Sequence, residues 1–246
     1  PFRYFPFKPS QVFDILDEQQ KYLSENIIIL GGGSLGREFF KKNLNKLKAK
    51  DRKYKLIAWG VGVDEVIKRQ QILNFKENFE LFGTWFDGFD EVGIRCYSEK
   101  QKYLWVPCAS CMSPLFFKYR DKHPQKKMGI YNHKRVPLLN KSVEDISSIN
   151  NSGNNLEEKL SFISQHEYIL TNTYHGVYWA TLMNRKVICA PFKSGLFSFK
   201  HPPTYCDGNI DEEILEKATS FPNSLEECRE KNINFYFNIF EKYGDL

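Results

Sequence analysis

The sequence has no long hydrophobic run and no targeting segment. No apolar stretch approaches the roughly 18 residues that a membrane-spanning helix needs. No basic and then apolar leader opens the chain, which starts at Pro1 rather than at Met. We therefore expect a soluble, cytoplasmic protein whose first residue is internal to a gene product or processed, with its first domain truncated at the start.

Cysteine is scarce and is not spaced like a metal site. The six cysteines are scattered along 246 residues, a chain too long to need disulfide staples, so we expect free thiols. Cys108 and Cys111 form a C-x-x-C pattern, but no second such pair and no histidine pair with zinc spacing accompanies it. We therefore favour the interpretation that Cys108 and Cys111 are small buried residues beside a cleft, rather than zinc ligands or a redox couple. We expect no metal and no cofactor.

The charge balance is only mildly basic, at a formal net charge of +5. We find no stripe of Lys and Arg with interleaved aromatic residues, so a solvated surface is favoured over nucleic-acid binding. Acidic substrates and peripheral contact with the inner membrane face are compatible with this charge. We therefore expect an anionic small-molecule partner and no nucleic acid.

The length allows one large core or two small ones, and alternating strand and helix patterns favour two compact α/β units. Residues 119–127, rich in Lys, His and Pro, are the best candidate for a linker. We therefore predict an N-terminal domain over residues 1–122 and a C-terminal domain with a terminal helix over residues 123–246.

An apolar run that leads into glycines marks the first predicted strand. Residues 26–30 predict a buried parallel strand, and residues 37–47 predict a helix. Between them, Gly32, Gly33 and Ser34 let the backbone approach a ligand, and NH groups before a helix favour a phosphate or carboxylate. We expect these three residues to bind substrate.

The same glycines also fit a dinucleotide pattern, Gly31-x-Gly33-x-x-Gly36. A nicotinamide site would also need an acidic residue at the end of the next strand. The strand predicted at residues 55–59 is followed by Gly60 instead, so a nicotinamide site is disfavoured.

Further elements of both kinds are predicted from hydrophobic periodicity. In chain order they are a surface helix over residues 13–23, a crossover helix over 64–81, strands at 89–94 and 127–133, a polar loop at 147–155, and helices over 156–164, 211–219 and 224–243.

The chain is organised around a strand, turn, helix and strand over residues 168–192. In such a unit the loop after the first strand lies at the carboxyl edge of a parallel sheet, where ligands bind. We expect Thr171, Asn172, Thr173 and His175 to lie over a cleft. The alternative is that Thr173 caps the helix and His175 packs in its first turn.

Basic residues follow the strand predicted at 127–133. His133, Lys134 and Arg135 would lie at its carboxyl edge, facing the same cleft as His175 if the two domains oppose each other.

Taken in order, these motifs resemble the polysaccharide pyruvyl transferase family. The matching features are the glycine strand, Arg95 and Ser98 after a strand, the strand ending at His133, the His175 unit, and a Ser-x-Lys loop at Ser198 and Lys200. The chain departs from the family where Thr173 replaces an Arg and Cys96 replaces an acid. It also lacks the family's short acidic and apolar motif near Cys108.

The resemblance implies an α/β fold of two facing Rossmann-like domains with parallel sheets, similar to the GT-B type glycosyltransferase architecture. It also implies transfer of a pyruvyl (ketal) group from phosphoenolpyruvate to a sugar in the biosynthesis of cell-surface polysaccharide, such as capsule or exopolysaccharide. The acceptor would be a glycan or a lipid-linked sugar, and phosphoenolpyruvate would be the donor substrate rather than a cofactor.

Ketal formation requires protonation of the methylene carbon of phosphoenolpyruvate, attack by a sugar hydroxyl and loss of phosphate. An imidazole exchanges protons near neutral pH, so we expect His175 to be the acid/base. Cationic groups hold carboxylate and phosphate, and this role is expected of Arg95, His133, Lys134 and Lys200.

Two other functions remain open. A GT-B-like glycosyltransferase would hold a nucleotide diphosphate at a helix N-terminus and on the basic groups. A noncatalytic glycan-binding or partner-binding domain would account for the altered motif positions.

Overall fold

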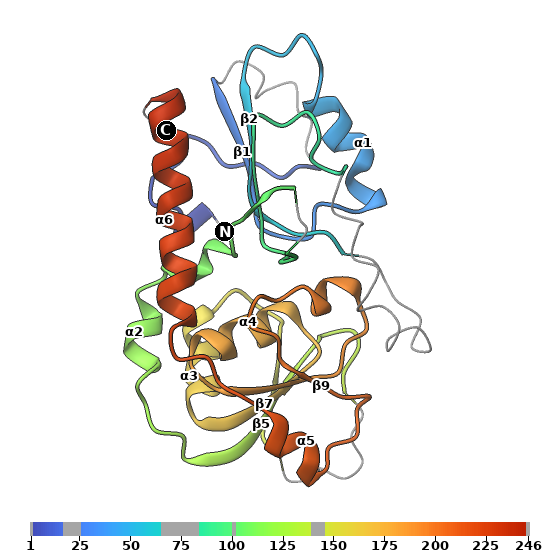
Figure 1. Ribbon diagram of the computed structural model, residues 1–246, viewed down its shortest axis with the longest axis vertical. Helices are drawn as coiled ribbons and strands as arrows, with labels where there is room; N and C mark the ends of the chain where they lie inside the picture. The colour runs from blue at the N-terminus through green and yellow to red at the C-terminus, as the bar shows by residue number, and fades with distance from the viewer. Residues whose placement is uncertain (1, 17–25, 65–83, 100–101, 139–145, 245–246) are drawn as a thin grey trace. The chain divides into compact units, whose positions relative to one another are not determined.

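The computed structural model describes residues 2–16, 26–64, 84–99, 102–138 and 146–244. These residues divide into two compact units. Unit 1 holds the described residues up to 64, from 84 to 112 and from 228 onward, and unit 2 holds those from 113 to 227. Each unit contains one sheet with helices, as Figure 1 shows.

Unit 1 is built on a four-stranded parallel sheet in the order β1-β2-β3-β4. Its strands are β1 (Ile27–Gly31), β2 (Lys55–Val61), β3 (Glu91–Ile94) and β4 (Leu104–Trp105). Its helical segments are η1 (Phe2–Tyr4), α1 (Glu38–Leu47), η6 (Ala109–Met112) and most of α6 (Ser224–Tyr243).

Both faces of this sheet are covered. Along β2, Leu56 and Ala58 pack in one apolar core with Leu44 of α1, whereas Ile57 and Trp59 pack in a second core with Phe235 and Ile239 of α6. Side chains alternate across a strand, so one strand supplies both cores. This explains why β2 is a nearly continuous apolar run, as expected of a strand inside a parallel sheet.

Unit 2 is built on a five-stranded parallel sheet in the order β6-β5-β7-β8-β9. Its strands are β5 (Lys126–Asn132), β6 (Ser148–Asn150), β7 (His166–Thr171), β8 (Lys186–Cys189) and β9 (Thr204–Tyr205). Its helices are α2 (Leu115–Tyr119), α3 (Leu156–Ser164), α4 (Tyr174–Leu182) and α5 (Glu212–Lys217), and its loops include η7 (Ser194–Phe197).

Three helices of unit 2 begin at polar caps. The side chains of Asn155, Thr173 and Asp211 accept hydrogen bonds from backbone NH groups in the first turns of α3, α4 and α5. Such caps satisfy NH groups that have no partner within the helix. They explain where these helices begin.

The chain is thus an α/β protein with two parallel sheets, which confirms the fold class at this level and is compatible with two Rossmann-like domains. The predicted domains 1–122 and 123–246 assign the last helix differently from the compact units, and those boundaries stay a prediction. No helix in the described ranges combines the length and apolarity that a membrane crossing requires.

Two predicted elements are wrong where the structure describes them. Residues 13–16 form a loop and turn rather than helix, because Asp14 accepts a hydrogen bond from the Leu16 NH and Asn43 donates to the Ile15 carbonyl. The polar segment 147–155 contains β6, which pairs with β5. The rest of the helix predicted over 13–23, and the crossover helix over 64–81 beyond Asp64, lie outside the described residues.

Candidate functional site

The carboxyl edge of the unit 2 sheet gathers most of the predicted site residues. Strands β5, β7 and β8 are neighbours, so the loops that follow them lie side by side at one edge. His133 and Lys134 follow β5, and Asn172 and Thr173 follow β7. His175 lies in the first turn of α4.

Two threonine hydroxyls join β7 to helix α4. Thr171 Oγ1 donates to the Tyr131 carbonyl at 2.7 Å and lies 3.2 Å from Thr173 Oγ1. Thr173 Oγ1 accepts the NH of Gly176 at 2.8 Å and so caps the helix. The expected substrate-binding hydroxyls thus bond to the protein's own groups.

Asn172 holds the turn that follows β5. Its carbonyl oxygen accepts the NH of His133 at 2.8 Å, and its NH₂ group donates to the Val136 carbonyl at 2.6 Å. The side chain is 2% exposed. Asn172 therefore acts as a clamp on the turn at residues 133–136, and its expected contact with substrate stays a prediction.

The clamped turn presents basic side chains. Asn151 accepts the NH of Lys134 at 2.8 Å, and the NH of Arg135 donates to His133 Nδ1 at 3.2 Å. Because His133 Nδ1 accepts, the proton of a neutral ring lies on Nε2. The side chains of Lys134 and Arg135 are exposed, and no carboxylate of the described residues pairs with either of them.

His175 packs among aromatic rings at the start of α4. Its ring stacks on Trp179, with centroids 4.7 Å apart, and meets Tyr174 edge-on at 5.5 Å. The residue is half-buried. Together with the cap at Thr173, this is the packing expected of a structural histidine. The acid/base role of His175 stays a prediction, because a half-buried imidazole can both pack in a helix and exchange a proton.

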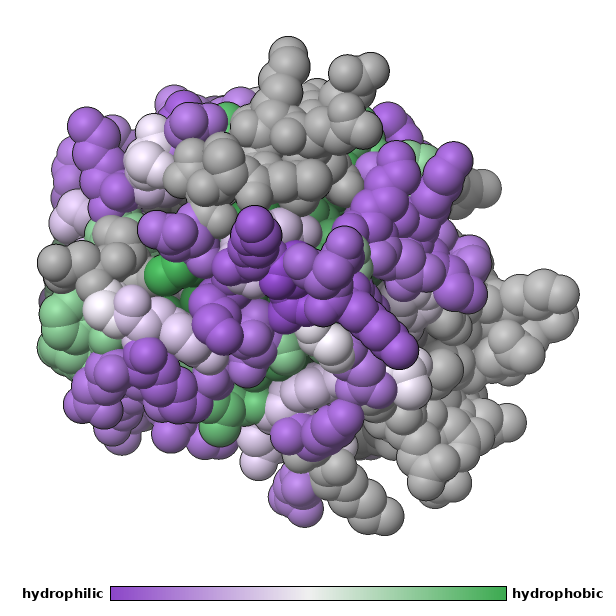
Figure 2. Space-filling view, turned by 90° about the horizontal axis from the view of Figure 1, so that it is seen from above, coloured by the Kyte–Doolittle hydropathy of each residue, from purple (hydrophilic) through white to green (hydrophobic). Residues whose placement is uncertain are grey.

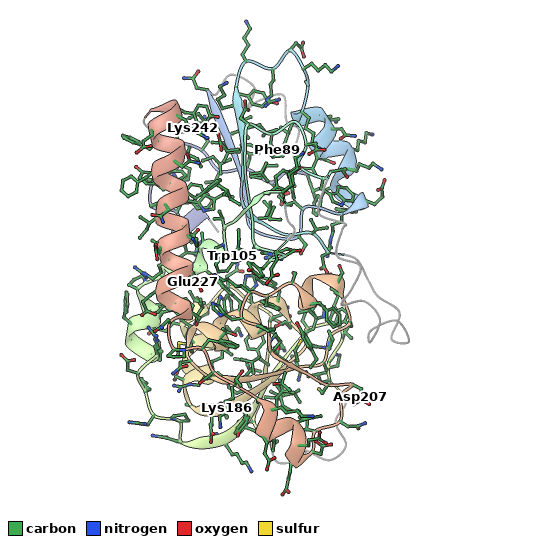
Figure 3. All side chains as sticks on the ribbon, viewed as in Figure 1. Phe89, Trp105, Lys186, Asp207, Glu227 and Lys242 are labelled. Atoms are coloured by element: carbon green, nitrogen blue, oxygen red, sulfur yellow. The ribbon has the colours of Figure 1, made fainter. Side chains whose placement is uncertain are left out.

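The Ser-x-Lys loop lies within unit 2 beyond η7. Ser198 is buried and donates to the Gly195 carbonyl at 2.9 Å. Lys200 forms an ion pair with Glu227, labelled in Figure 3, and His201 Nε2 lies 2.7 Å from the other oxygen of that carboxylate. An anion that binds Lys200 would compete with this carboxylate.

The same contacts set the protonation of Glu227. Burial by itself raises its pKa, but hydrogen bonds from Lys200 and His201 outweigh burial, so the pKa lies below its usual value of 4.5. Glu227 therefore remains a carboxylate at neutral pH and keeps Lys200 paired.

The glycine loop lies at the carboxyl edge of the unit 1 sheet. Gly32 and Gly33 have φ angles of 68° and 67°, a region that favours glycine. The loop is tied to the end of β2, because the NH of Gly32 donates to the Trp59 carbonyl at 3.3 Å and that of Gly62 donates to the Gly33 carbonyl at 2.9 Å. These contacts hold the glycine loop against the end of β2, and the approach to a ligand stays a prediction.

Arg95 follows β3 and lies beside this loop. It is 6% exposed, and its Nη2 donates to Ser34 Oγ at 2.8 Å. A Cβ at Gly62 would lie 2.5 Å from Arg95 Nε, so only glycine leaves room for the guanidinium there. Ser34 and Arg95, each predicted to bind substrate, are thus brought together. Ser98 lies half-exposed three residues further on.

None of the six cysteines forms a disulfide with another, as the sequence predicts, and all six are buried. Cys96 Sγ accepts the NH of Val63 at 3.4 Å. Cys108 directly precedes η6, and Cys111 lies within it. The Ser110 hydroxyl donates to Cys108 Sγ at 3.4 Å, and the Asn232 side chain donates to Cys111 Sγ at the same distance. Within the part of the chain that the structure describes, no group of three or more His, Cys, Asp or Glu side chains could hold a metal ion.

The sequence missed two residues that shape these loops. Asn151 lies in a segment predicted as a polar loop, and an Asn-rich stretch is the only signal that could have pointed to it. Glu227 follows Lys200 by 27 residues and belongs to a helix predicted only from its apolar face, so no local pattern links the two.

Comparison with protein-family models, with curated proteins and with solved structures found no match to this chain. The resemblance to the pyruvyl transferases therefore depends on the residues themselves and on their placement.

Proposed function

We propose that the protein is a transferase of cell-surface polysaccharide biosynthesis that moves a pyruvyl group from phosphoenolpyruvate to a sugar. We further propose that its two units are Rossmann-like domains that face each other as in the GT-B architecture, and that it works in the cytoplasm. The observation that carries the proposal is the clamped basic turn at residues 133–136, next to the first turn of α4.

This turn suits an anionic donor. Phosphoenolpyruvate carries a carboxylate and a phosphate, and the turn offers Lys134 and Arg135 without a competing carboxylate among the described residues. A guanidinium binds a carboxylate through two parallel hydrogen bonds, whereas an ammonium binds phosphate as a point charge. The clamp by Asn172 holds both side chains on a fixed backbone, which lowers the entropy cost of binding.

The proposed reaction needs one acid next to this anion site. His175 gives a proton to the methylene carbon, one sugar hydroxyl adds to the adjacent carbon, and a second hydroxyl displaces phosphate to close the ketal. Of the two hydroxyl protons, one replaces the proton lost by His175 and the other leaves with phosphate. Arg95 and Ser34, in unit 1, are proposed to bind a further anionic or polar group of the substrates.

The first test compares ligands by the melting temperature of the protein. We expect phosphoenolpyruvate to raise the melting temperature, because a ligand that binds only the folded state stabilises it. The variant Lys134→Gln, Arg135→Gln should lose this effect, whereas the control Lys126→Gln, Lys127→Gln, which removes the same charge from the start of β5, should keep it. Stabilisation by nucleotide sugars alone would favour the glycosyltransferase, and stabilisation by glycans alone would favour the binding domain.

The second test measures phosphate release with a panel of sugar acceptors. His175→Ala should lose at least about a hundredfold in turnover, within the range of general acid catalysis, and should retain stabilisation by phosphoenolpyruvate. A structural histidine would instead lower the melting temperature and leave turnover per folded molecule unchanged. A folded, fully active His175→Ala protein would therefore overturn the mechanism.

A further inference from the structure

Helix α1 and the turn after it carry a dense set of positive charges. From residue 41 to residue 55, every charged residue is basic except Asp51. The whole chain has a formal net charge of only +5, so this stretch concentrates positive charge on one part of unit 1.

Most of these lysines have no carboxylate partner. Arg52 and Lys55 both pair with Asp90, and Lys41 pairs with Glu38 at 3.1 Å. Four exposed lysines make no ion pair with any described residue: Lys42, Lys46, Lys50 and Lys53. Among the described residues, these four side chains are therefore exposed charges outside any ion pair.

A large apolar side chain lies among these lysines. Phe39 is 70% exposed, the highest value for any large hydrophobic residue in the described part of the chain. Residues three and seven positions apart share one face of a helix, so Phe39 lies in line with Lys42 and Lys46. The opposite face carries the buried Leu44.

Two further features lie next to α1. Asn43 binds the Ile15 carbonyl at 2.9 Å, and the next residue, Leu16, is 54% exposed. On the other side of α1 lies a shallow hollow of about 140 Å³, lined by Lys41, Leu44, Asn45, Lys48, Thr84 and Trp85. Hydrophobic residues are otherwise scattered among hydrophilic ones on the face shown in Figure 2.

We propose that this face, made of Phe39, Leu16 and the lysines of α1 and its following turn, binds the anionic surface of a lipid bilayer. A helix with exposed lysines and an exposed apolar residue can lie in the headgroup region, where the apolar side chain inserts and the lysines meet lipid phosphates. Leu16 favours a bilayer over nucleic acid, because an aliphatic side chain gains from insertion but offers no ring for base stacking. The inference is independent of the proposed transferase activity.

The test is sedimentation of the protein with vesicles. Binding is expected to vesicles that contain phosphatidylglycerol and not to vesicles of phosphatidylcholine alone, and it should weaken as salt rises. The double variant Lys42→Gln, Lys46→Gln should bind these vesicles about 25-fold more weakly, because each lysine near an anionic surface contributes about fivefold to the affinity. Phe39→Ser should weaken it about tenfold and leave the salt dependence unchanged, because it removes apolar contact and no charge.

A matched control separates this face from net charge. The variant Lys126→Gln, Lys127→Gln loses the same charge in unit 2 and should bind vesicles like the unaltered protein. Equal weakening by the two double variants, or unchanged vesicle binding by Phe39→Ser, would overturn the proposal. So would tighter binding to single-stranded RNA than to the anionic vesicles, which would identify the face as a nucleic-acid site. Melting temperatures confirm that each variant is folded.

Discussion

Single buried polar side chains in unit 2 bind mainly to the protein's own backbone. Asn172 clamps a turn, and Thr173 caps a helix. His166 is completely buried, donates from Nδ1 to the Phe162 carbonyl at 2.8 Å and accepts from the Ser147 hydroxyl at 2.7 Å. The exposed Lys134 and Arg135 differ from these residues, since no carboxylate of the described residues pairs with either side chain.

His166 makes stability depend on pH. Burial lowers its pKa below the usual 6.5, the bond to the Phe162 carbonyl opposes this shift, and the charge of Lys126 adds to it. The folded state thus binds the proton less tightly than the unfolded state. The difference in proton binding contributes to the free energy of unfolding. This contribution is complete above about pH 6.5 and is lost as the pH falls toward the pKa of His166 in the folded state.

We expect the free energy of unfolding to decrease below pH 6.5 by up to about 1.4 kcal/mol per pH unit from this group. Urea unfolding at a series of pH values measures it. The variant His166→Gln, which keeps a polar side chain without a titration in this range, should show a shallower slope. Identical slopes in the two proteins would contradict the assignment.

At the scale of elements, the contact of α4 with β7 depends on one glycine. A Cβ at Gly176 would lie 2.2 Å from Thr171 Oγ1 and 2.9 Å from Tyr131 Cδ1. Both neighbours are buried, so neither can move without disturbing the sheet. The helix can approach its strand this closely only because residue 176 lacks a side chain.

The variant Gly176→Ala should therefore lower the free energy of unfolding by about 1–3 kcal/mol, the usual cost of overpacking a core. Alanine is otherwise the better helix former by about 1 kcal/mol, so the clash must outweigh this gain. Asn45→Ala, on the exposed face of α1, is the control and should be neutral or slightly stabilising. Denaturant unfolding of both variants gives the comparison, and a stabilised Gly176→Ala protein would show that α4 can move away.

The sequence predicted long and strongly periodic elements and missed short ones. Helix α3 and strands β1 and β5 lie within a residue or two of their predicted bounds. Apolar runs mark the two strands, and the cap at Asn155 marks the start of α3. Strands β4 and β9 have two residues each, too few to show a period.

The sequence predicted where the candidate site lies but not what each of its residues contacts. The rule that ligands meet the carboxyl ends of parallel strands located both glycine and basic loops. Whether Asn172 faces a ligand or the backbone depends on how the turn at residues 133–136 folds back, which is a tertiary contact with no sequence pattern. The pairing of Lys200 with Glu227 is hidden for the same reason.

At the scale of the whole molecule, unit 1 depends on the end of the chain. Helix α6 returns to this unit, and its buried residues recur every three or four positions: Leu225, Cys228, Asn232, Phe235 and Ile239. Asn232 is completely buried, accepts Trp59 Nε1 at 2.8 Å, and donates to the carbonyls of Cys228 and Pro107 at 2.9 Å and 3.2 Å.

Asn232→Ala should lower the free energy of unfolding by about 3 kcal/mol, because it leaves the buried Trp59 NH without its acceptor and opens a small cavity. The neighbouring Asn234→Ala removes the same side chain at an exposed position and should change stability by less than about 0.5 kcal/mol. Tryptophan fluorescence during denaturation reports on both. Equal effects would show that the Asn232 network adds nothing to stability.

Unit 1 is built from chain segments that come before and after residues 113–227 of unit 2, and this arrangement sets an order for folding during synthesis. A ribosome makes residues 113–227 before residues 228–246, so all of unit 2's described segments have been made while the second core of unit 1 still lacks Phe235 and Ile239. In that interval Trp59 and Val106, which are buried in the finished protein, have no helix to cover them. Unit 2 can therefore fold first, and this apolar face of the nascent chain stays exposed, and prone to aggregation, until α6 is translated.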